Sequence, residues 1–76
     1  MAYLNGENIK PANNAEAKKL IGKRVQYLRS TDIDRSGRGY IFPRTGTIVE
    51  VVRRNIDIDG NMVHLSDIVE MVELVS

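Results

Sequence analysis

Short segments in which apolar and polar residues alternate are the most regular pattern along this chain. Residues 23–29 place Val25 and Tyr27 on one face, and residues 47–53 are rich in β-branched side chains. A period of two is typical of a half-buried β-strand, and β-branched residues suit its pleated surface. The pattern therefore predicts strands at 23–29 and 47–53, with a turn at Thr45-Gly46 leading into the second.

The next segments predict a hairpin. Asp59-Gly60 separates residues 55–58 from residues 61–65. Asp-Gly accepts the positive φ angles that a two-residue hairpin turn requires. Together with the strand at 47–53, these segments form a predicted meander of three strands.

Residues 65–68 break the alternation, which predicts a single 3₁₀ turn followed by a closing strand at 70–75. The rival interpretation is one helix over 66–75, with its apolar residues on one stripe. Its β-branched content argues weakly against a helix, because such side chains lose rotamer freedom there. Both interpretations stay open.

The N-terminal third predicts little regular structure. Residues 1–12 predict either an extended arm or a short ribbon. Residues 13–21 predict a short helix, because Asn13 or Asn14 can cap its start and Gly22 can end it. The chain then divides into this arm, the helix and a β domain over 22–76.

The expected core is small and aliphatic. The register of 47–53 is ambiguous, because Ile48 and Val52 make the second face of that strand apolar as well. That second face is a candidate homodimer contact. The residues expected in the core are Val49, Val51, Val63, Leu65, Ile68 and Val72, with Leu20 and Ile21 of the helix turned toward them.

Composition narrows the class of protein. Seventy-six residues make one small domain with a thin core, and the absence of cysteine excludes disulfides and thiolate sites and favours the cytoplasm. The chain shows no leader pattern and no apolar run long enough to span a bilayer.

The charged residues are distributed unevenly along the chain. Residues 1–54 carry all eleven Lys and Arg together with five Asp and Glu, whereas residues 55–76 carry five Asp and Glu and no Lys or Arg. This asymmetry indicates either a basic binding face or neutralisation within the fold.

The long loop over 30–45 is the candidate binding segment. It combines arginines, glycines and two aromatic rings, the mixture that contacts phosphates and stacks on unpaired bases. The rings can alternatively pack inward and leave the arginines solvated. The candidate binding residues in this loop and the neighbouring strands are Lys23, Arg24, Arg35, Arg38, Tyr40, Phe42, Arg44, Arg53 and Arg54.

The sequence gives only partial matches to a calcium site or a histidine-based site. Asp32, Asp34 and Gly37 match the opening of a calcium loop, but Pro43 stands at the twelfth position, where a bidentate Glu is needed. His64 is the single histidine, so it has no partner set for a metal or a nucleophile. We therefore predict neither a metal, nor a cofactor, nor an enzyme.

The order of elements resembles a small SH3-like β-barrel, of the broad group that includes KOW and Tudor-type modules. The resemblance covers residues 22–75 and rests on the strand after Gly22, the long loop, the strand after Gly46, the Asp59-Gly60 hairpin and residues 63–68 before a short last strand. It implies an all-β fold, with one short N-terminal helix and five strands. Such barrels bind nucleic acid, peptides or modified side chains at one rim, but this chain lacks the rings for a Tudor-type aromatic cage. The chain also resembles the short accessory proteins of bacteria and their prophages.

These observations predict a cytoplasmic, non-enzymatic binding module of bacterial or phage origin. A protein-interaction or adaptor domain is the favoured interpretation, with loop 35–44 and the adjacent strands as its contact surface. A nucleic-acid-binding module that uses the same basic and aromatic residues is the alternative. The partner is then a protein or a nucleic acid, and not a membrane.

Overall fold

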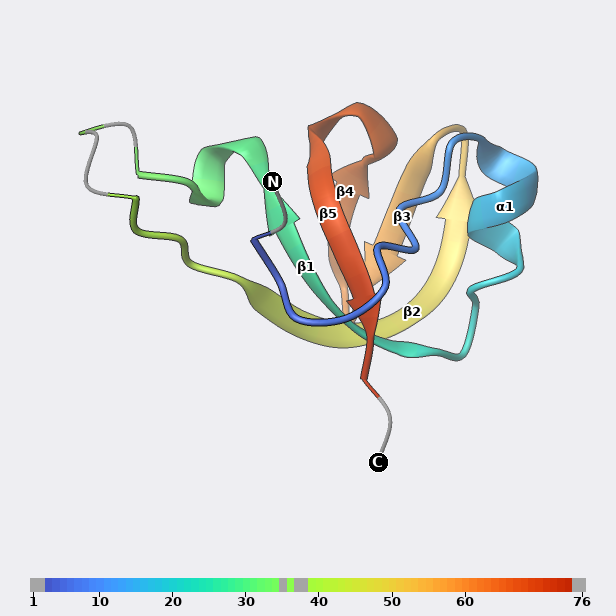
Figure 1. Cartoon of the computed structure of the whole chain (residues 1–76). Helices are drawn as coiled ribbons and strands as arrows, with labels where there is room; N and C mark the ends of the chain where they lie inside the picture. The colour runs from blue at the N-terminus through green and yellow to red at the C-terminus, as the bar shows by residue number, and fades with distance from the viewer. Residues whose placement is uncertain (1–2, 35, 37–38, 75–76) are drawn as a thin grey trace.

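The computed structural model describes residues 3–34, 36 and 39–74. It contains one short helix and five strands, with a 3₁₀ turn after the first strand and another before the last (Figure 1). The elements are α1 (Asn14–Lys18), β1 (Arg24–Arg29), the 3₁₀ turn Ser30–Asp32, β2 (Arg44–Val52), β3 (Asn55–Ile58), β4 (Asn61–His64), the 3₁₀ turn Leu65–Asp67 and β5 (Ile68–Glu73). The predicted β-rich class and strand number are confirmed, and the C-terminal segment is a strand rather than a helix. None of the described helices is long and apolar enough to cross a membrane.

The strands form one antiparallel sheet in the order β4-β3-β2-β1-β5, which is not closed into a barrel. The prediction of a closed barrel is therefore wrong. The outer edge of β5 is already occupied by the N-terminal arm: Ile9 N–H donates to the Met71 carbonyl at 2.7 Å, and Met71 N–H donates to Asn8 Oδ1 at 3.1 Å. An edge strand whose backbone groups are paired in this way offers them to no further strand.

Strand β2 is the long element that both halves of the sheet share. Residues 44–47 pair with β1, and residues 48–52 pair with β3, so β2 curves from the projecting loop toward α1 (Figure 1). The register shifts between Ile48 and Glu50, as a β-bulge requires. The strand begins at Arg44, and the predicted turn at Thr45-Gly46 is therefore wrong.

The bulge decides which side of β2 faces the core. Ile48 and Val51 are both buried, although they are three residues apart, whereas Val49 between them is 54% exposed. An extra residue in one strand reverses the alternation beyond it. The prediction of Val49 in the core is therefore wrong, while Val51 is confirmed.

The main core lies between the two halves of the sheet, and α1 covers part of it. Asn13 caps the helix by accepting the Glu16 N–H, and Ala17 is fully buried. Leu20 packs against the core, but Ile21 is exposed, contrary to expectation, because the helix ends before it. The buried residues of this core are Ala17, Val25, Tyr27, Ile48, Val51, Ile56, Ile58, Val63, Leu65, Ile68 and Met71.

A second, smaller core lies under the N-terminal arm. Leu4 of the arm packs with Leu28 of β1 and Val72 of β5. The buried carboxylate of Glu70 accepts the backbone N–H groups of Tyr3 at 2.6 Å and of Leu4 at 3.3 Å. Buried polar groups need such partners, so this carboxylate holds the arm in place.

The predicted Asp59-Gly60 turn is confirmed. Both residues have positive φ angles, 51° and 89°, and the Gly60 N–H donates to Asp57 Oδ1 at 2.8 Å. The β3–β4 hairpin in turn brings Ile58 over Gly46 of β2. A Cβ atom built at Gly46 would lie 2.7 Å from Ile58 Cγ2, so only glycine fits there without a shift of the neighbour.

We expect Gly46→Ala to lower the free energy of unfolding by about 1–3 kcal/mol, because overpacking displaces the Ile58 side chain. Urea denaturation followed by circular dichroism measures the change. Ile58→Ala removes the nearest atom that the new Cβ would contact and leaves Asp59 Oδ2, at 2.9 Å, on an exposed side chain that can move, so Gly46→Ala should be less destabilising in that background. Equal losses in both backgrounds would contradict this packing.

Candidate functional site

Part of the predicted loop 30–45 is a paired ribbon. The Asp34 N–H donates to the Tyr40 carbonyl and the Phe42 N–H to the Asp32 carbonyl, both at 2.8 Å, and Ile33 pairs with Ile41 between them. We call residues 32–34 and 39–42 the ribbon. It projects from the sheet beyond β1 and β2 (Figure 1). The partly buried Ile33 and Ile41 pack on the small core under the arm, which anchors one face of the ribbon.

The two aromatic side chains lie at the surface of the ribbon. Successive residues of an extended strand point to opposite faces, so Tyr40 and Phe42 share the face opposite Ile41. They are 57% and 63% exposed. The interpretation in which these rings pack inward is therefore wrong, and both rings are exposed on one face of a hydrogen-bonded ribbon.

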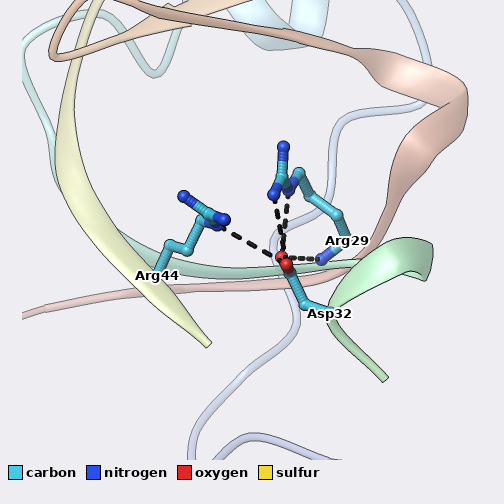
Figure 2. Close-up of polar contacts among 3 residues, drawn as sticks. All are labelled: Arg29, Asp32 and Arg44. Carbon is cyan, nitrogen blue, oxygen red and sulfur yellow. Dashed lines mark hydrogen bonds and ion pairs between the residues drawn. The ribbon is translucent and has the colours of Figure 1, made fainter. Parts of the chain in front are cut away.

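Asp32 fixes the base of the ribbon through two arginines (Figure 2). Its carboxylate accepts the Arg29 Nε at 3.0 Å and Nη2 at 3.1 Å, the Arg29 backbone N–H at 3.2 Å, and the Arg44 Nε at 3.5 Å. The Asp32 side chain is 6% exposed, whereas those of Arg29 and Arg44 are 28% and 51% exposed. We call these three residues the Asp32 clamp.

The contacts within the Asp32 clamp shift the pKa values of Asp32 and Arg29. The hydrogen bonds from the Arg29 side chain are the main reason that the pKa of Asp32 lies below its ordinary value of 3.8, and the same pairing raises the pKa of Arg29. A carboxylate whose pKa is lower in the folded state stabilises the fold above its unfolded pKa. That contribution is lost as the pH falls through the lowered pKa.

The structure does not bring the predicted basic residues together. Lys23 forms an ion pair with Glu73 at 3.3 Å, and Arg24 lies at the start of β1, opposite Thr47. Arg53 and Arg54 form the turn between β2 and β3, at the opposite end of β2 from Arg44. Arg35 and Arg38 lie outside the described residues. Of the predicted set, Tyr40 and Phe42 therefore lie on the ribbon, and Arg44 lies at its base through its contact with Asp32.

Sequence reasoning missed Arg29 and the structural role of Asp32. The signal was their spacing, because residues three apart around a single 3₁₀ turn lie close together.

Asp34, the other acid considered for a calcium loop, is engaged by Ser36. Its carboxylate accepts hydrogen bonds from the Ser36 N–H and hydroxyl, which lower the pKa of Asp34. Among the residues described, no cluster of three His, Asp or Glu side chains could hold a metal ion.

The chain matches no protein-family model, and its comparison with curated proteins and with solved structures gives no match. The geometry of the ribbon and the Asp32 clamp is therefore the basis for inferring a function.

We expect Asp32→Asn to destabilise the protein by about 1–2 kcal/mol at neutral pH, because the variant loses charged hydrogen bonds to both arginines. The parent should lose this contribution as the pH falls below 3.8, whereas the variant has none to lose. Urea denaturation at neutral and acidic pH measures both effects. Glu50→Gln, at an exposed carboxylate of β2, is the control. A constant difference between parent and Asp32→Asn at every pH would contradict the assigned pKa shift.

Proposed function

We propose that the protein is a small non-enzymatic binding module that contacts a protein partner through the outer face of the ribbon. The observation that carries this proposal is the pair of exposed rings, Tyr40 and Phe42, on one face of an ordered projection. Aromatic side chains supply much of the binding energy in protein interfaces. A ribbon that is ordered before binding also loses less conformational entropy on association.

Partial neutralisation of the arginines at the base of the ribbon favours a protein over a polyanion. Arg29 and Arg44 share the carboxylate of Asp32, so the clamp has a net charge of only one. Arg44 is half exposed and can still reach an acidic group on a partner beside the two rings. The partner surface that suits this site therefore has an apolar pocket with a carboxylate at its rim.

The architecture is consistent with modules of this kind. The order of helix, strand, long loop, three-stranded meander, 3₁₀ turn and last strand is the order on which the SH3-like resemblance rests. We propose an SH3-like arrangement in an open form, with the N-terminal arm along β5. The ribbon then extends the loop between β1 and β2, at one rim of the sheet.

We expect Tyr40→Ala and Phe42→Ala to weaken partner binding by roughly tenfold or more each, with little change in stability, because truncating an aromatic anchor removes its buried contact. Quantitative affinity capture from a bacterial lysate, followed by titration of the captured protein, measures the effect. Met62→Ala is the matched control, because Met62 is similarly exposed on β4. Capture of the same proteins at the same affinity by the ribbon variants would remove the ribbon from the contact surface.

Nucleic-acid binding is the second candidate, and the same two rings favour it. Bases stack on exposed aromatic side chains, and Arg44 lies two residues from Phe42, where it can meet a phosphate. The separate positions of Lys23 and of Arg53 and Arg54 argue against a continuous phosphate track.

A titration with short single- and double-stranded oligonucleotides distinguishes the two candidates. If the second is correct, the amide signals of Tyr40, Phe42 and Arg44 should shift, more strongly for single strands and at low salt, because phosphate contacts strengthen as salt falls. NMR chemical shifts provide the measurement. No response of these amides at low salt would eliminate the nucleic-acid function and leave the protein partner.

A further inference from the structure

A second concave surface lies away from the ribbon, where the N-terminal arm passes the β2–β3 turn. It is a cleft of about 300 Å³, which is the lower end of the size range for small-ligand sites. Pro11 and Leu65 are buried apolar residues of its lining, which also includes two cationic side chains. Its lining residues are Lys10, Pro11, Ala12, Arg54, Leu65 and Ser66.

Backbone hydrogen bonds fix the origin of both cationic side chains. The Leu65 N–H donates to the Arg54 carbonyl at 2.8 Å, which ties the β2–β3 turn to the 3₁₀ turn before β5. On the N-terminal arm, the Lys10 N–H donates to Asn8 Oδ1 at 3.0 Å, and the Ile9 N–H donates to the Met71 carbonyl of β5. The two side chains that line the cleft therefore start from backbone positions held by hydrogen bonds.

The turn that presents Arg54 has an unusual sequence. Arg53 and Arg54 have φ angles of 48° and 69°, in the left-handed region that Asn and Gly adopt more readily. Neither Lys10 nor Arg54 forms an ion pair within residues 3–34, 36 and 39–74. Two like charges thus line a small cleft. The Glu16 carboxylate accepts the Ala12 N–H at 2.8 Å beside it but forms no ion pair with either cation among the described residues, so a bound anion would relieve the repulsion between Lys10 and Arg54.

We propose that this cleft binds a small organic phosphate monoester. Such a group carries close to two negative charges at neutral pH, which matches one lysine and one arginine. The planar Arg54 guanidinium can donate two parallel hydrogen bonds to phosphate oxygens, while Lys10 contributes a point charge. The esterified group then lies on Pro11 and Leu65.

Ser66 adds a preference to the site. Its backbone N–H donates to His64 Nδ1 at 3.1 Å, and its hydroxyl oxygen lies 2.7 Å from the same nitrogen. The Ser66 hydroxyl is therefore held at the lining of the cleft. There it can exchange a hydrogen bond with a hydroxyl on the esterified group, as in a sugar phosphate, and it leaves the phosphate itself to Lys10 and Arg54.

Titration of the isotope-labelled full chain at low salt tests the proposal, with inorganic phosphate, phenyl phosphate and ribose 5-phosphate as probes. We expect saturable NMR shifts at the amides of Lys10, Ala12, Arg54, Leu65 and Ser66, and tighter binding of the esters than of inorganic phosphate. A stronger response to phenyl phosphate identifies an apolar ester group, and a stronger response to ribose 5-phosphate identifies a hydroxylated one. Absence of saturation with all three probes would overturn the proposal.

The turn supplies a matched pair of variants. Arg54→Asn should weaken ester binding by roughly tenfold, because it removes the bidentate donor. Arg53→Asn removes the same charge from the neighbouring residue, which does not line the cleft, and should change affinity less than about twofold, because an exposed charge outside the site is screened. Asn tolerates the left-handed region, so both variants should fold at least as stably as the parent. Equal losses of ester affinity in the two variants would show that net charge alone attracts the ester, and would overturn the proposed site.

The ribbon variants Tyr40→Ala and Phe42→Ala should leave ester binding unchanged. The outcome of the titration is therefore independent of the proposed protein partner.

Discussion

The membership of β2 in both halves of the sheet is the constraint on which the rest of this structure depends. The strand pairs first with β1 and then with β3, and the bulge at Val49 lets Ile48 and Val51 face the same core. Without the extra residue, strict alternation would bury one of these side chains and expose the other. The lack of a side chain at Gly46 lets Ile58 of β3 pack closely against β2. One strand thus joins two pairs of strands around the main core.

Local chemistry in the sequence was enough to predict the elements but not how they meet. The Asp59-Gly60 turn, the strand after Gly22, and the 3₁₀ turn before β5 follow from residue preferences over a few positions. The bulge at Val49 was missed because its residues alone fit either register. The open sheet was missed because the arm competes for the edge of β5 through atoms more than 60 residues away in sequence, such as Met71 N–H and Asn8 Oδ1.

The two ends of β2 carry different surfaces, although the sequence predicted one set of binding residues that includes Tyr40, Phe42 and Arg54. At the first end, Asp32 neutralises part of the charge of Arg29 and Arg44, and the exposed rings of Tyr40 and Phe42 form the surface of the ribbon. At the other end, Arg54 and Lys10 both line a cleft to which the docked arm also contributes Pro11 and Ala12. The composition of residues 35–54 indicated both kinds of chemistry. Their separation could not be predicted, because it depends on the length and the curvature of the strand between them.

The hydrogen bonds between the arm and β5 also constrain how the protein folds. Glu70 accepts the N–H groups of residues 67 and 66 positions earlier in the chain, and β5 pairs with β1 rather than with its sequence neighbour β4. Contacts between residues so far apart in sequence require a long loop to close, and the chain loses entropy before the contacts stabilise the fold. Proteins dominated by such contacts fold slowly. The hairpins β2–β3 and β3–β4 can form from local sequence alone. Closure of the second core must wait for β5, and the Glu70 carboxylate keeps its hydration until the arm replaces the water.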